Sequence, residues 1–217
     1  MDRERFLERV AASVASGHLP AMAPVAERLP EMGPIDLLGL FRERARSVDA
    51  EVHGPVARHG VPAKVAGLIA SMEPKIFIAW DDLPVPGVPA ALAAAGWRRL
   101  GHSVGSETRL DDQLEYGDLT LGVTGADAGL AESGSVVLGH GPGRPRMASL
   151  IPETHVVLLE APSIVRTLSH WAEKNPDSAR RTANLVVITG PSRTGDIELQ
   201  LNLGVHGPRQ VHIVVIE

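Results

Sequence analysis

The chain of 217 residues contains no cysteine, and aromatic residues make up only 3% of it. It therefore has no disulfide, no thiol nucleophile and no thiolate ligand for an iron–sulfur cluster of its own. Few aromatic side chains leave few surfaces on which single-stranded bases could stack. The formal net charge of −5 argues against binding along a phosphate backbone, so no nucleic-acid partner is expected.

Long hydrophobic runs are also missing. The charged start Met1–Arg5 is not followed by a continuous apolar segment, so no secretory signal is predicted. No run of about 18 apolar residues occurs, so no membrane span is predicted. A hydrophobic share of 44% and a charged share of 22% are typical of a globular protein. We expect a cytoplasmic protein.

The first 34 residues are predicted to form a helical arm and a proline-rich linker. Apolar residues recur at helical spacing between residues 2 and 16, and Gly17 supplies a stop. Four prolines between residues 20 and 34 then interrupt any regular element. The arm is expected to pack on its own domain or to dock on a partner, and the domain itself to occupy residues 35–217.

Residues 35–217 alternate between short apolar strands and helical segments. Helices are expected at 35–47, 61–72, 90–95 and 162–173, and strands at 75–80, 119–123, 136–138, 155–160, 184–189 and 210–216. This alternation predicts an α/β sandwich with a largely parallel sheet.

The first candidate site is a tight turn that follows the strand expected at 184–189. A turn at the carboxyl edge of an α/β sheet opens toward the ligand crevice. If a helix begins near Gly195, its free N–H groups and Arg193 would bind an anion. Alternatively, the hydroxyls cap a helix and the carboxylate accepts hydrogen bonds from the turn. The residues concerned are Ser192, Arg193, Thr194 and Asp196.

A second candidate turn runs from Thr124 to Ser135 and also follows an apolar strand. Asp127 is predicted to cap a short helix that carries Glu132. A carboxylate beside a glycine-rich return could be a nucleophile or a general base. The alternative is a solvated residue at the end of a helix.

The third candidate is His206, which lies between Gly204 and Gly207 on a constrained turn. It could act as a proton shuttle or a metal ligand, or be a simple hydrogen-bonded residue. A metal site assembled from Glu132, Asp196 and His206 stays open, although no metal is predicted. His212 lies in a strand expected to be buried and is predicted to be an ordinary hydrogen-bonded histidine.

Nucleotide motifs are not supported. The turn Gly139–Gly143 is followed by Arg144 and Pro145, so no helix can start cleanly there, and no Walker sequence occurs. No cofactor is therefore expected to bind through motifs of this chain.

Four motifs in this order resemble the lactate utilization protein C family, whose shared unit is the LUD domain: Thr124–Gly134, Ser149–His155, Gly190–Glu198 and Gly204–Pro208. The resemblance covers roughly residue 40 to the end. It implies a three-layer α/β/α fold similar to the NagB/RpiA/CoA-transferase-like group. It also implies a part in oxidising L-lactate to pyruvate together with iron–sulfur partner proteins.

Three functional hypotheses follow. In the first, the chain is a substrate-binding or accessory subunit for a small carboxylate, and partner proteins supply the electron acceptor. Arg193 would clamp the carboxylate, His206 or Glu132 would take the hydroxyl proton, and Asp196 would orient the base or Arg193. The other anion-binding candidates are Thr124, Asp127, Ser192 and Thr194.

In the second hypothesis the chain is an enzyme acting on acyl-CoA or phosphate esters. The sequence Glu132-Ser133-Gly134 resembles the Glu-Asn-Gly turn of CoA-transferases, in which the glutamate is the nucleophile; here serine replaces asparagine. In the third, the chain is a scaffold whose helix at residues 2–16 docks on a partner. A homo-oligomer is left open.

Overall fold

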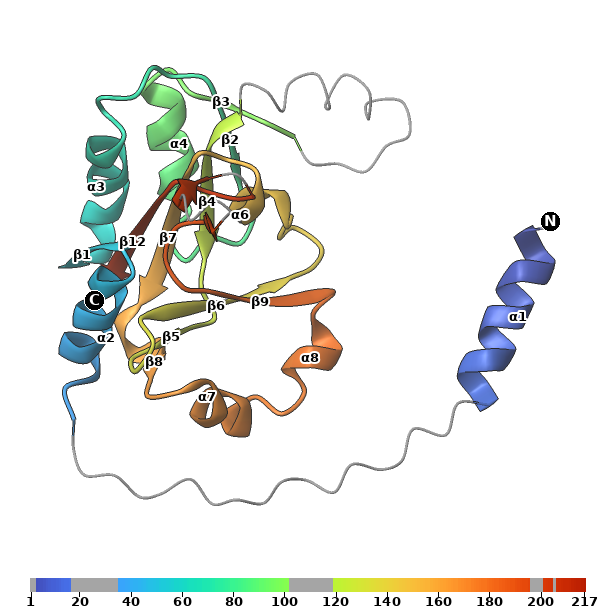
Figure 1. Cartoon of the computed structure of the whole chain (residues 1–217). Helices are drawn as coiled ribbons and strands as arrows, with labels where there is room; N and C mark the ends of the chain where they lie inside the picture. The colour runs from blue at the N-terminus through green and yellow to red at the C-terminus, as the bar shows by residue number, and fades with distance from the viewer. Residues whose placement is uncertain (1–2, 17–34, 102–118, 196–200, 205) are drawn as a thin grey trace. The chain divides into compact units, whose positions relative to one another are not determined.

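The computed structural model describes residues 3–16, 35–101, 119–195, 201–204 and 206–217 (Figure 1). The chain divides into two units, residues 1–32 and 33–217. In the first unit the predicted helix is observed as α1 (Arg3–Ser16). No helix among the described residues is long and apolar enough to cross a membrane.

The second unit is built on a six-stranded sheet, which we call the main sheet. Its order is β1 (Glu51–Val56), β12 (Gln210–Ile216), β7 (Thr154–Glu160), β4 (Leu119–Gly125), β2 (Ile76–Ala79) and β3 (Arg98–Arg99). Every neighbouring pair is parallel, which confirms the predicted α/β fold. The central strands are buried almost along their whole length, as expected where a parallel sheet is covered on both faces.

Helices cover the main sheet, and they are α2 (Leu37–Ser47), η1 (Arg58–Gly60), α3 (Val61–Leu68), α4 (Gly87–Ala94) and α6 (Met147–Leu150). The α2 helix begins after Asp36, whose Oδ1 accepts a hydrogen bond from the Gly39 N–H at 2.9 Å. Helices α3 and α4 pack on each other, and α6 packs on β4. The strand β1 was not predicted, because Gly54 and Pro55 interrupt its apolar pattern.

A second sheet has the order β8 (Ile164–Val165), β5 (Ala128–Leu130), β6 (Ser135–His140) and β9 (Asn184–Ile188). The short helix expected after Asp127 is wrong. Residues 128–130 instead pair with β6 on one side and β8 on the other, so their backbone hydrogen bonds are made between strands.

The remaining elements are η3 (Ala161–Ser163), α7 (Leu168–Lys174) and α8 (Ser178–Arg181). The helix predicted at 162–173 begins later than expected, because β8 precedes it and Thr167 caps it by accepting from the His170 N–H at 3.4 Å. A helix starting near Gly195 is one of the alternatives that the sequence allows, but Gly195 itself lies in a strand. Strand β10 (Arg193–Gly195) pairs antiparallel with β11 (Leu201–Leu203).

The packing of α6 on β4 depends on Gly122. A methyl group at this position would overlap the Ala148 carbonyl oxygen of α6. We therefore expect Gly122→Ala to lower the free energy of unfolding by about 2 kcal/mol or more, measured by urea denaturation. Gly67→Ala in α3 is the matched control, because a methyl group there meets nothing within 4 Å. That change should raise the free energy by about 0.5–1 kcal/mol, and equal losses in both variants would contradict this packing.

Candidate functional site

A cavity of about 240 Å³ lies beyond the carboxyl ends of the main-sheet strands, between Asp127 and the helices α7 and α8. We call it the crevice. Its lining residues are Asp127, Arg144, Trp171, Asn175, Ser178, Arg181, Thr182 and Leu185. Parallel α/β sheets bind ligands at this edge, because the loops that follow the strands converge there.

One wall of the crevice is a network of charges centred on Arg144. Its Nε donates to Asp82 Oδ2 at 2.7 Å, and its Nη1 donates to Asp127 Oδ1 at 3.0 Å. The hydrogen bond with Asp82 is the main reason why the pKa of Arg144 is raised. The guanidinium also lies 4.8 Å from the ring centroid of Trp80, which follows β2. The network holds Arg144 between two carboxylates and an aromatic face.

Asp127 is fixed from both sides. Its Oδ2 accepts a hydrogen bond from the Gly139 N–H at 2.6 Å, while Oδ1 faces Arg144. Its backbone N–H donates to the Val137 carbonyl at 2.8 Å, which ties the turn after β4 to β6. The carboxylate therefore joins the main sheet to the second sheet.

The crevice is also lined by Arg181, the last residue of α8. Arg181 is exposed and has no ion-pair partner within the ranges that the structure describes. The hydroxyl of Ser178 and the side chains of Asn175 and Thr182 line the same crevice. An arginine without a carboxylate partner beside hydroxyl and amide groups suits an anionic ligand with a planar head, such as a carboxylate.

The buried side chains that carry polar atoms include Trp80, His140, His155 and Thr124. Trp80 and His140 form an edge-to-face pair with ring centroids 5.7 Å apart. His155 on β7 is fully buried, and its Nε2 lies 2.9 Å from Thr124 Oγ1. Burial, followed by the charge of His140, lowers the pKa of His155 to about 3, so its imidazole is neutral at pH 7. Thr124 is thus engaged inside the core.

The turn that carries Arg193 lies beside the end of α2. Arg193 forms an ion pair with Asp49, and a methyl group on Gly190 would overlap the Val48 carbonyl oxygen. The Ser192 N–H donates to the Pro208 carbonyl at 2.8 Å, and its own carbonyl accepts from the Gly204 N–H at 3.0 Å. These backbone bonds join two of the predicted turns to each other.

Glu132 and His206 are not among the residues that line the crevice. Glu132 is 44% exposed, and its Oε1 accepts from Arg166 Nε at 2.5 Å. His206 is exposed, the side chain of Thr194 is not described, and Asp196 lies outside the described residues. Among the predicted site residues whose side chains the structure describes, Asp127 lines the crevice, and the proposed roles of all eight stay predictions.

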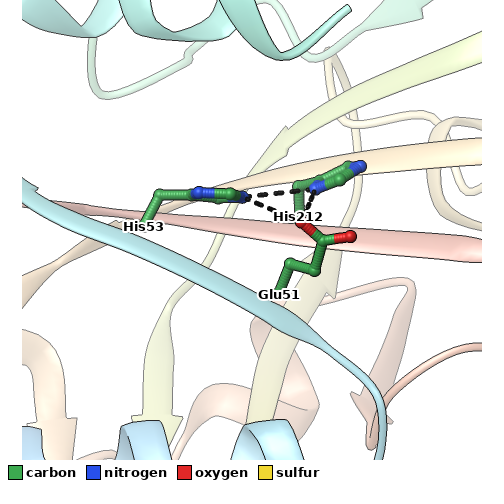
Figure 2. Close-up of side chains that lie close together, drawn as sticks. All are labelled: Glu51, His53 and His212. Carbon is green, nitrogen blue, oxygen red and sulfur yellow. Dashed lines mark hydrogen bonds and ion pairs between the residues drawn. The ribbon is translucent and has the colours of Figure 1, made fainter.

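Sequence reasoning missed Arg144 and Arg181. The available signal was the glycine-rich turn Gly139–Gly143, which cannot start a helix but places the next residue, Arg144, against Asp127. Residues able to hold a metal come together elsewhere among the described residues, as the group Glu51, His53 and His212 on β1 and β12 (Figure 2).

Comparison with known proteins identifies relatives over most of the chain. The model of the LUD domain matches residues 81–216. A lactate utilization protein C from Deinococcus radiodurans is 33% identical over 97% of this chain and 93% of its own length. Another from Halalkalibacterium halodurans is 27% identical over 99% and 97%. A crystal structure of a DUF162 family protein from Deinococcus radiodurans has a similar fold, with a TM-score of 0.63, 21% identity, and coverage of 86% of this chain and 100% of that one.

The buried His155 makes stability depend on pH. Its pKa is about 3 in the folded chain and about 6.5 when unfolded, so below pH 6.5 only the unfolded chain takes up this proton. The free energy of unfolding should therefore fall on acidification from about pH 6.5, by about 1.4 kcal/mol per pH unit for this group. His155→Gln keeps a hydrogen-bonding group beside Thr124 but does not titrate. Urea denaturation should show a shallower slope for this variant, and equal slopes would contradict a neutral buried His155.

The charge of Asp127 can be tested without changing its shape. Asp127→Asn retains an acceptor for Gly139 but leaves Arg144 with one carboxylate fewer. We expect the free energy of unfolding to fall by about 1–2 kcal/mol. Asp177→Asn is the control, because its contact with Arg180 is exposed and 3.8 Å long, and this change should cost less than about 0.5 kcal/mol. A larger loss in the control would be evidence against the network.

Proposed function

Because the chain belongs to the LUD domain family, we propose that it takes part in lactate utilization by binding a small carboxylate, L-lactate or pyruvate. Relatives that are similar over nearly their full length are named lactate utilization protein C. The relatives' name indicates the process, and the side chains that line the crevice include groups that could bind such a ligand.

The observation that carries the proposal is Arg181 in the crevice. An arginine binds a carboxylate best when no protein carboxylate competes for its N–H donors. Arg144 is already held by Asp82 and Asp127, whereas Arg181 has no ion-pair partner in the described part of the chain. Arg181 is therefore the cation that would receive the ligand, and Ser178 would add a hydroxyl donor.

The rest of the crevice would orient the ligand. Asp127 and Arg144 line the crevice together with Arg181. The hydroxyl of lactate would donate to the Asp127 carboxylate, and the carbonyl oxygen of pyruvate would accept from Arg144. Because these two groups hold each other at 3.0 Å, they are in place before the ligand arrives.

Oxidation of lactate to pyruvate releases two electrons and two protons, so an acceptor is required. A chain without cysteine has no thiolate of its own to hold an iron–sulfur cluster. We assign the acceptor to iron–sulfur partner proteins and the binding of the carboxylate to this chain. The acyl-transfer alternative gains no support from the position of Glu132, whose carboxylate is paired with Arg166.

Arg193 is the competing clamp, and its surroundings differ from those of Arg181. It is paired with Asp49 beside the end of α2, so a ligand carboxylate would have to replace that partner. At Arg181 the ligand would replace no carboxylate partner among the described residues. The two arginines therefore provide a matched pair of variants.

The test is titration of L-lactate and pyruvate into the untagged full chain by isothermal calorimetry. Arg181→Gln should weaken the binding of lactate and of pyruvate by at least about tenfold, because the ligand loses one charged hydrogen-bonding partner. Arg193→Gln should leave binding within about twofold of the parent. Lactamide, which has no carboxylate, should not bind. Loss of binding in Arg193→Gln with full binding in Arg181→Gln would refute the crevice as the site.

A further inference from the structure

The amino ends of β1 and β12 bring two histidines and a glutamate together. Glu51 and His53 are two residues apart on β1, so they project from the same face of the strand. Glu51 lies opposite His212 in the parallel register of β1 and β12. Figure 2 shows the three side chains pointing toward one another from these two strands. We call this group the histidine cluster.

The separations between its donor atoms match those of metal ligands. His53 Nε2 is 3.2 Å from His212 Nδ1, and Glu51 Oε2 is 3.4 Å from His212 Nδ1 and 3.8 Å from His53 Nε2. A triangle with these sides has a point about 2.0 Å from every corner, which is the usual length of a zinc–nitrogen or zinc–oxygen bond. An ion at that point would therefore lie within bonding distance of all three atoms.

The way in which the two ring nitrogens meet also suits a metal. His53 Nε2 and His212 Nδ1 face each other at 3.2 Å. Two lone pairs that face each other at this distance repel, unless one nitrogen carries a hydrogen or a cation lies between them. A bound ion satisfies both nitrogens and the carboxylate together.

The cluster is open on one side. The side chains of His53 and His212 are 16% and 10% exposed, whereas that of Glu51 is 65% exposed. A cavity of about 410 Å³ adjoins Glu51 and His53 and is lined by Arg46, Asp49, Ala50, Glu51, Val52 and His53. Three protein ligands with a free fourth position are the arrangement of zinc sites that exchange a water or a ligand.

From this geometry we propose that the chain binds one divalent transition-metal ion, such as Zn²⁺, through Glu51, His53 and His212. Imidazole ligands favour such ions over Mg²⁺ and Ca²⁺, which prefer oxygen. The site lies at the opposite edge of the main sheet from the crevice and does not depend on the proposed lactate binding.

The first measurement is calorimetric titration of zinc chloride into the untagged full chain. We expect one equivalent of Zn²⁺ to bind with micromolar or tighter affinity, and millimolar Mg²⁺ not to compete. The absence of a zinc-binding event, or its loss on addition of Mg²⁺, would overturn the proposal. Lactate binding is measured on the same samples without zinc, so a failure of either proposal is distinguished from a failure of the other.

Variants then locate the ion. His53→Gln, His212→Gln and Glu51→Gln should each weaken zinc binding by at least about tenfold. His59→Gln is the matched control, because His59 is exposed on η1 and is no member of the cluster, and its affinity should equal that of the parent.

Glu51→Gln also guards against misfolding as a cause, since the Glu51 side chain is largely exposed, and circular dichroism should show an unchanged fold. Parent-like affinity in the three cluster variants, or an equal loss in His59→Gln, would refute the site.

Discussion

The insertion of the last strand, β12, between β1 and β7 is the constraint on which the rest of the second unit depends. Buried backbone N–H and carbonyl groups must find partners, and β12 finds them along its whole length with β7 and over most of β1. This pairing brings His212 beside Glu51, although 160 residues separate them in the chain. It also aligns β7 with β4, whose carboxyl end leads to Asp127.

Because its strands are parallel, the main sheet has two different ends. The carboxyl termini of all its strands lie at one end, where Trp80 and Asp127 follow β2 and β4. The amino ends of β1 and β12 meet at the other, where the histidine cluster lies. The chemistry of the two ends differs accordingly. The crevice offers the guanidinium of Arg181, which has no ion-pair partner in the described part of the chain, and hydroxyls suited to an anion. The cluster offers imidazoles and a carboxylate suited to a cation.

Two glycine-rich turns pack closely against α2. Added methyl groups at Gly134 and Gly190 would overlap the backbone of α2 at Ala45 and just beyond its end at Val48. Only glycine permits this close approach. The turns therefore hold the end of α2, from which the chain runs through Asp49 directly into β1 and Glu51. Glycines in two of the candidate turns thus have a packing role against α2, the helix that precedes the first strand of the sheet.

The sequence by itself determined the α/β class, the strands with continuous apolar runs and the family, because these depend on local periodicity and on short motifs. It also indicated Asp127 as part of a site. Only the tertiary structure decided that Arg181 has no carboxylate partner among the described residues and that His212 lies against Glu51 and His53. These contacts result from the order and register of the strands. Order and register depend on pairing between segments far apart in the sequence, which a local sequence pattern does not predict.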